Sequence, residues 1–237
     1  MDLETLEYSL DEGVATVTMN RPERRNAVNR KMFQELESVF AHIGSDRQVR
    51  SFVLTGKGDH FCSGADLSII EEAPTSKEQA LERMREIHRI LKTIVYCPKP
   101  GVAAVRGYAA GGGANLALAC DIVVMAEDAK FAELFVKRGL VVDMSGTFTL
   151  PRAVGLHRAK ELSLLGDPID ARRAYEMGIA NRVVAPDDVA GTARELAEKL
   201  AAGPPQAMSM IKAALNDSFS KHFDEVLEQE STHQSEL

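Results

Sequence analysis

Three consecutive glycines, Gly111, Gly112 and Gly113, lie between an apolar run that ends at Val105 and the alanine-rich segment Ala114–Cys120. That order predicts a strand, a glycine turn and a buried helix. Glycines leave backbone N–H groups uncovered by side chains, and the start of a helix adds N–H groups without intrahelical partners. The turn can therefore hold a phosphate, a carboxylate, or an oxygen that becomes negative during a reaction.

The common phosphate-binding motifs match this turn poorly. A dinucleotide-binding turn needs a third glycine where Leu116 stands, and a P-loop needs Lys and Ser or Thr where Ala114 and Asn115 stand. A close helix–sheet contact explains the glycines equally well. A second loop, Phe61–Leu67, favours a functional site over a simple helix–sheet contact. It also follows a predicted strand and offers backbone N–H groups beside small residues. Two such loops can each donate one N–H to one oxygen, which is the design of an oxyanion hole.

The composition limits the classes of partner. The chain has 237 residues, of which 45% are hydrophobic and 27% charged, as in a globular protein. A net charge of −7 argues against a general nucleic-acid or anionic-membrane surface. No apolar run reaches the roughly 20 residues of a membrane span. No signal peptide is visible, and the three cysteines lack metal spacing, so we predict a cytosolic protein without a metal site.

The first two-thirds of the chain alternate predicted strands and helices, and the last third is helical. A hairpin is predicted from two alternating runs around Asp11-Glu12-Gly13. Further strands are predicted at 51–55, 102–105, 122–126 and 183–184, with 130–135 as strand or loop. Helices are predicted at 29–43, 75–95, 114–120, 147–153, 156–165, 170–177, 187–202 and 205–227. This order indicates an α/β core followed by helices that cap it or reach a neighbouring subunit.

Several ordered stretches resemble the crotonase superfamily, the enoyl-CoA hydratase/isomerase family. They extend from the first hairpin to about Leu215. The matching stretches are NRPERRNAVN (20–29), FCSGADL (61–67), RGYAAGGGANLALACD (106–121), KFAELFVKRGL (130–140), LPRAVG (150–155) and GDPIDARRAYEMGIANRVV (166–184). Because the motifs occur together and in the order of the family, the resemblance is specific for the superfamily.

The resemblance implies an α/β fold, a crotonase-like spiral of repeated ββα units over residues 1–185. A C-terminal helical trimerisation region then follows over residues 186–237. Members of the family usually continue with a further helical tail, so we expect this region to be incomplete at its C-terminus. The implied assembly is a homotrimer or a dimer of trimers.

The resemblance also implies an acyl-CoA thioester as the substrate. Coenzyme A is then part of the substrate, and no separate cofactor is expected. By position, the N–H groups of Ala65 and Gly112 hold the thioester oxygen and stabilise an enolate. Arg24 and Arg25 form a cationic turn suited to the CoA phosphates, although a solvated charge run is an equal alternative for either one. The adenine and pantetheine are expected along the stretch that includes Ser63, Asp66, Leu67 and Ser68.

Two positions depart from the hydratases of the family. Those enzymes use two glutamates, one to activate water and one to deliver a proton. Asn115 and Phe135 stand at the matching positions here, and neither side chain can transfer a proton, so both are expected only to contact substrate. Glu133 is close in sequence to Phe135. We expect it to be an exposed surface carboxylate, with an acid–base role as the weaker alternative.

Asp143 is the remaining carboxylate of interest. Local sequence favours it as the N-cap of the helix predicted after it. The stretch GLVVDMSGTFTLPR (139–152), however, resembles the phenylacetate-pathway branch of ring-epoxide enoyl-CoA isomerases, in which an Asp stands at this position and an Asn at that of Asn115. A dehalogenase branch also has an Asp there, as a nucleophile, but differs around the glycine turn.

We therefore take Asp143 as the catalytic carboxylate, in an apolar pocket that raises its pKa. The hypothesis is a single-carboxylate proton shuttle that moves a double bond or isomerises a ring-CoA. The alternatives are an enoyl-CoA hydratase and a non-catalytic acyl-CoA-binding protein.

Overall fold

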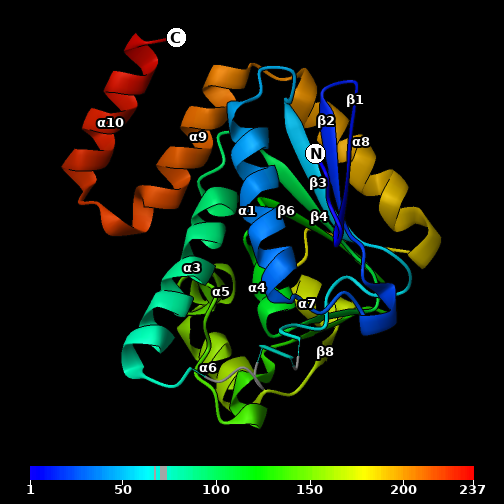
Figure 1. Ribbon diagram of the computed structural model, residues 1–237. Helices are drawn as coiled ribbons and strands as arrows, with labels where there is room; N and C mark the ends of the chain where they lie inside the picture. Colours follow the sequence, from blue (N-terminus) through cyan, green and yellow to red (C-terminus); the bar gives the residue numbers. More distant parts are fainter. Residues whose placement is uncertain (67, 70–73) are drawn as a thin grey trace.

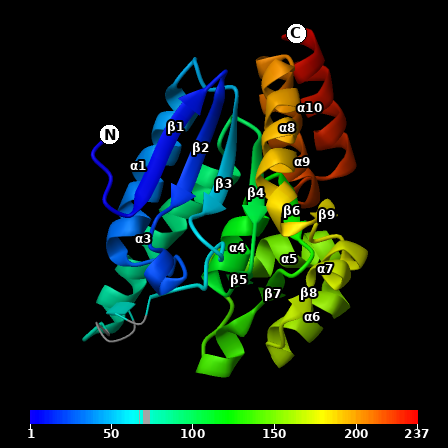
Figure 2. The ribbon, with the colours of Figure 1, turned by 90° about the vertical axis from the view of Figure 1, so that its right-hand side faces the viewer.

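The computed structural model describes residues 1–66, 68–69 and 74–237. Within them, six strands form the main sheet, in the order β1 (Leu6–Asp11), β2 (Val14–Met19), β3 (Ser51–Gly56), β4 (Gly101–Val105), β6 (Ile122–Ala126) and β9 (Arg182–Val184). β1 pairs antiparallel with β2, and the other neighbours are parallel. Three short strands, β5 (Tyr108–Ala110), β7 (Lys130–Ala132) and β8 (Ile169–Asp170), form a second sheet (Figure 2).

Helices cover the main sheet on both sides. Figure 1 shows α1 (Arg30–Ser45) and α8 (Val189–Ala202) on opposite sides of it. β4 is buried along its whole length, which explains why its sequence is continuously apolar rather than alternating. β1 lies at the edge and alternates between more and less buried positions. The hairpin and the central strands predicted from the sequence are therefore confirmed.

The remaining helices lie close to their predicted places. α3 (Lys77–Val95) packs against α1, and its N-cap Ser76 accepts a hydrogen bond from the Gln79 N–H. Further predicted helices are α4 (Gly112–Leu118), α5 (Gly146–Val154), α6 (Leu156–Leu165) and α7 (Ala171–Met177). Three short 3-10 helices were not predicted: η1 (Pro22–Arg24), η2 (Leu134–Arg138) and η3 (Pro186–Asp188). The domain boundary after residue 185 stays a prediction; α8, beyond it, buries Val189 and Ala193 in the main core.

The single helix predicted at 205–227 is wrong, because the chain breaks within it. α9 (Pro205–Asp217) is followed by η4 (Ser218–Ser220) and a separate helix, α10 (Phe223–Ser235). His222 caps α10, and its N–H donates to the Glu225 carboxylate at 2.7 Å. This reciprocal capping box specifies a new helix start. The prediction missed the break because apolar residues continue at helical spacing across it.

α9 is fixed to the sheet by an ion pair between a buried lysine and a more exposed aspartate. The Lys212 ammonium lies 2.8 Å from the Asp121 carboxylate, which also accepts the Gly101 N–H at the start of β4. Beyond this anchor, α9, η4 and α10 expose a row of large apolar side chains: Ile211, Leu215, Phe219, Phe223 and Leu227. Among the described residues, no helix combines the length and hydrophobicity of a membrane span. The cytosolic location stays a prediction.

Candidate active site

The glycine turn joins β5 to α4, and α4 begins at Gly112. Gly111 adopts φ +53° and ψ −121°, a conformation that side chains disfavour. A Cβ atom on Gly113 would lie 2.3 Å from the Cys62 carbonyl oxygen. Gly113 therefore allows close contact with the second predicted loop. The sequence alone left open a helix–sheet contact, but the close partner is this loop.

Backbone hydrogen bonds hold the two loops together. The Cys62 N–H donates to Tyr108 O at 2.9 Å, and the Ala110 N–H donates to Cys62 O at 3.0 Å. A Cβ atom on Gly64 would lie 2.8 Å from Ala110 O and 3.7 Å from the Gly112 nitrogen. The two predicted donors, Ala65 and Gly112, therefore sit on segments in direct contact.

Both predicted donors keep a free N–H. Ala65 forms an isolated parallel bridge with Val28, in which Val28 N–H donates to Gly64 O and Asp66 N–H donates to Val28 O. In this pattern the Ala65 N–H points away from Val28. Gly112, as the first residue of α4, has no intrahelical acceptor. Within the described part of the chain, neither N–H donates to another protein atom.

Asp66 holds the first loop against the cationic turn. Its carboxylate lies 2.6 Å from the Arg21 guanidinium, and both side chains are mostly buried. Burial disfavours the charged form of Asp66, but the Ser68 N–H and the Arg21 guanidinium outweigh that effect and hold the pKa of Asp66 below its usual value. Asp66 thus has partners inside the protein, and its predicted contact with substrate remains a prediction.

Removal of this charge is expected to loosen the loop. The Asp66→Asn variant should lose about 2 kcal/mol of unfolding free energy, because the partly buried Arg21 guanidinium is left without its anion. Urea unfolding measures this loss. The control is Glu7→Gln, which breaks the exposed Glu7–Lys57 pair and should cost about 0.5 kcal/mol or less. Equal losses in the two variants would contradict an anchoring role for Asp66.

The predicted phosphate ligands lie beside the same loop. The Ser63 N–H donates to Arg25 O at 3.0 Å, and the Ser63 hydroxyl donates to Arg24 O. The Arg24 and Arg25 side chains are exposed, and neither forms an ion pair with a described residue. They are placed where a ligand phosphate can reach them, although this contact stays a prediction. Leu67 lies outside the described residues.

Asn115 connects the glycine turn to two carboxylates. It is fully buried in α4, and its amide nitrogen donates to the backbone oxygen of Asp143 at 2.9 Å. The same nitrogen lies 3.5 Å from a carboxylate oxygen of Glu133. The Asn115 oxygen is buried without a protein partner in the described residues. Asn115 therefore joins α4 to the segment before α5.

The N-cap expected for Asp143 is wrong. α5 begins at Gly146, with Ser145 at its N-cap position, and no side chain caps it. Met144 and Ser145 both adopt positive φ, so two left-handed residues separate Asp143 from the helix. Its carboxylate is free to face a cleft of about 950 Å³ between α3 and residues 140–148. Burial raises the pKa of Asp143 to about 6.

Glu133 is the residue that the sequence placed wrongly. Instead of being exposed, it is fully buried. It follows β7, whose Ala132 pairs with Ala110 of β5, so it emerges beside the glycine turn. Burial raises its pKa to about 8; the Asn115 amide opposes the shift and the Asp143 charge adds to it. Phe135, two residues after Glu133, is also buried. Its ring lies near Gly111: a Cβ atom added to Gly111 would be 3.9 Å from it.

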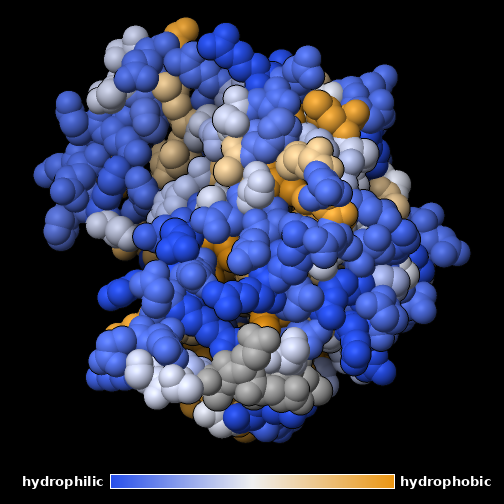
Figure 3. Space-filling view, viewed as in Figure 1, coloured by the Kyte–Doolittle hydropathy of each residue, from blue (hydrophilic) through white to orange (hydrophobic). Residues whose placement is uncertain are grey.

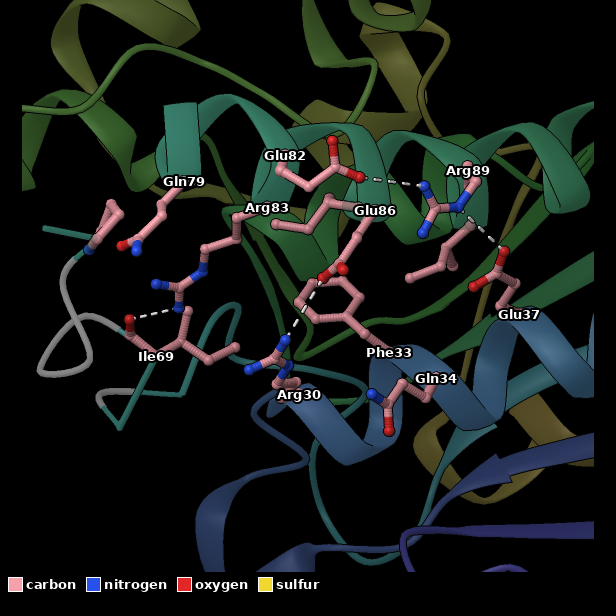
Figure 4. A pocket seen from close by; sticks show the side chains of 13 residues that line it. Arg30, Phe33, Gln34, Glu37, Ile69, Gln79, Glu82, Arg83, Glu86 and Arg89 are labelled. Atoms are coloured by element: carbon pink, nitrogen blue, oxygen red, sulfur yellow. Dashed lines mark hydrogen bonds and ion pairs between the residues drawn. The ribbon is translucent and has the colours of Figure 1, made fainter. Parts of the chain in front are cut away.

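A second cavity, of about 470 Å³, lies between α1 and α3 and contains none of the predicted site residues (Figure 4). Ion pairs join its two walls, with Arg30 near Glu86 and Arg89 near Glu37. The molecular face over these helices is mostly hydrophilic (Figure 3). The cleft beside Asp143 is therefore the better candidate for chemistry on an acyl group.

This arrangement has the groups needed to bind a negatively charged oxygen and to move a proton. Two free N–H groups lie on touching loops, and Asp143, whose pKa burial raises to about 6, lines the adjoining cleft. Among the described residues, no cluster of three or more His, Cys, Asp or Glu side chains could hold a metal ion.

A family model described as "Enoyl-CoA hydratase/isomerase" matches residues 9–237. The chain belongs to this family, and the predicted crotonase superfamily is confirmed. It is 38% identical over 227 residues to the 1,2-epoxyphenylacetyl-CoA isomerase of Escherichia coli K12, and the aligned residues cover 95% of this chain and 87% of that protein. It is 33% identical over 232 residues to the short-chain-enoyl-CoA hydratase of Clostridium acetobutylicum, which covers 98% and 88%.

The fold agrees with this assignment. The crystal structure of an enoyl-CoA hydratase/isomerase from Cupriavidus metallidurans CH34 superposes with a TM-score of 0.94 at 30% identity, covering 99% of this chain and 88% of that chain. The predicted α/β crotonase-like architecture is therefore confirmed. An acyl-CoA thioester fits the family as the substrate.

Proposed function

We propose that this protein is an enoyl-CoA isomerase, which moves a double bond or isomerises a ring-CoA by proton transfer through one carboxylate. The observation that carries the proposal is the placement of Asp143. Its carboxylate lines the cleft and caps no helix, while Asn115 holds its backbone beside the glycine turn. The 1,2-epoxyphenylacetyl-CoA isomerase among the relatives adds support for chemistry of this kind.

In the proposed reaction, the N–H groups of Ala65 and Gly112 bind the thioester oxygen. Asp143 removes a proton from the carbon chain or ring, and the electron pair of the broken C–H bond delocalises onto that oxygen. The two N–H groups stabilise the resulting enolate because they are already oriented when the charge forms. The protonated Asp143 then returns the proton to a different carbon, so no atom is gained or lost.

The second candidate is hydration of a 2-enoyl-CoA. Glu133 favours it, because this buried carboxyl lies within the electrostatic reach of Asp143 and gives the site two carboxyl groups. Hydration generally uses two such groups, one for the water and one for the carbon. The short-chain-enoyl-CoA hydratase among the relatives is consistent with this alternative.

A panel of enoyl-CoA and ring-CoA thioesters, incubated in heavy-oxygen water and followed by mass spectrometry, separates these functions. Isomerisation gives a product of unchanged mass and without label, which its retention time and fragment ions distinguish from the substrate. Hydration adds one labelled water. Binding of the thioesters with no turnover of any of them would support the third alternative, an acyl-CoA-binding protein, and would refute both enzymatic proposals.

We also propose that the protein assembles as a homotrimer or a dimer of trimers through its C-terminal region. The apolar row on α9, η4 and α10 is exposed in the single chain, and a partner subunit would cover it. Sedimentation at several concentrations measures the mass of the assembly. A monomer at all concentrations would contradict this proposal and leave the isomerase proposal standing.

A further inference from the structure

Glu133 is a buried ionisable group to which the proposed reaction gives no role. Its position follows from strand register. β5 and β7 run parallel, Ala110 pairs with Ala132, and the Gly111 N–H donates to Ala132 O at 2.7 Å. The next residue of each strand therefore emerges at the same edge of the small sheet. One strand continues into the glycine turn and the other into Glu133.

A short chain of contacts links Glu133 to Asp143. The Asn115 amide nitrogen lies 3.5 Å from one Glu133 oxygen and 2.9 Å from the backbone oxygen of Asp143. Two acceptors in this group, the Asn115 oxygen and the second Glu133 oxygen, are buried without a protein partner in the described residues. Buried acceptors of this kind are stabilised when a donor is available to them. A protonated Glu133 supplies one.

The charged groups around Glu133 also favour its neutral form. On η2, which begins one residue after Glu133, Lys137 pairs with Asp167 in an exposed contact. On α5, the Arg152 guanidinium lies over the Phe148 ring. α4 carries no charged residue. Asp143 is the charged group that acts on Glu133, and it is negative. Asp143 has the lower pKa and ionises first, so its charge is already present when Glu133 titrates.

We propose that Glu133, in its uncharged form, is a positioning residue of this site: it acts through Asn115 to hold the Asp143 segment beside the glycine turn. Ionisation of Glu133 would draw the Asn115 amide into a charge-assisted bond and away from Asp143 O. The Asp143 carboxylate would then lose its alignment with the oxygen-binding N–H groups. This inference rests on the proposed isomerase function.

The test is the pH dependence of kcat for a thioester that the protein turns over. In the wild type, kcat should rise through about pH 6 as Asp143 loses its proton, and fall through about pH 8 as Glu133 ionises. The Glu133→Gln variant keeps a neutral group of similar shape. It should retain at least about a third of the wild-type kcat at pH 7, with the alkaline limb gone and the acidic limb in place.

Two further variants separate positioning from mere bulk. Glu133→Ala removes the contact with Asn115 and should lower kcat at pH 7 about tenfold. Glu35→Gln removes a different buried carboxylate, which contacts Thr5 and Lys31 and is far from Glu133 in the sequence. It should leave both limbs of the pH profile of kcat unchanged. The proposal is overturned if the alkaline limb persists in Glu133→Gln, or if the Gln and Ala variants behave alike.

A second readout needs no substrate. The pKa of Glu133 is raised in the folded state, so the folded protein binds the extra proton between about pH 4.5 and pH 8. Stability therefore falls as pH rises through that window. The Tm of Glu133→Gln relative to wild type should increase from pH 5 to pH 8. If the difference in Tm between Glu133→Gln and wild type does not change with pH, Glu133 is not neutral in the folded protein and the positioning proposal is refuted. Activity in the Asp143→Asn variant would instead refute the isomerase proposal alone.

Discussion

Replacement of Asp143 by Asn is expected to lower kcat about 10³-fold or more, while the Kd for an acyl-CoA thioester changes less than about threefold. Asn has nearly the same size and can occupy the same place in the cleft, but its amide cannot accept a proton near neutral pH. The backbone contact from Asn115 to residue 143 uses the carbonyl oxygen and survives the change. Binding and turnover should therefore separate.

The comparison is made by measuring Kd by calorimetry and kcat with the thioester that the mass-spectrometric panel identifies. Asp167→Asn is the matched control, because Asp167 pairs with Lys137 at the surface and lies outside the cleft. It should retain full activity. A near-normal kcat in Asp143→Asn would exclude Asp143 as the proton carrier.

Replacement of Gly112 by Pro should cost about 10² to 10³-fold in kcat, because it deletes one oxyanion donor. Proline is tolerated at the first position of a helix, and Gly112 occupies that position in α4. The added carbon atoms would meet the Met144 sulfur, where a Cβ would lie at 2.6 Å. That atom ends a flexible side chain and can move.

Gly112→Ala controls for this crowding, since it adds the Cβ atom and keeps the N–H. It should lose no more than about tenfold in kcat, and circular dichroism should show that both variants fold. The difference between the two variants isolates the hydrogen bond. If Pro and Ala cost the same, the Gly112 N–H is not the donor.

The sequence was a good guide where a pattern is local. The apolar runs of β3, β4 and β6 each lie within a few residues of sequence, and the helices predicted at 29–43 and 170–177 begin directly after Asn29 and Asp170. The two glycine-containing loops were found for the same reason. We predicted that these loops meet because an oxyanion hole needs one N–H group from each. In the structure they are in contact at Gly113 and Cys62.

Features that depend on distant pairing were missed. β5 has three residues, too few for a periodic signal, and it exists because it pairs with β7. Without β5, nothing in the sequence placed Glu133 beside the glycine turn. The role of Asp143 was ambiguous for a similar reason. An N-cap and a cleft-lining carboxylate look alike until the positive φ angles of Met144 and Ser145 are known.

The close contact of Gly113 with the Cys62 carbonyl has a consequence for how such a site diversifies. Main-chain hydrogen bonds join the two loops there, so Ala65 and Gly112 can keep their relative position when the side chains of the neighbouring cleft change. Substitutions at Asn115, Glu133, Phe135 and Asp143 can then exchange one proton chemistry for another. The proposed oxyanion hole would then stay in place while the reaction changes.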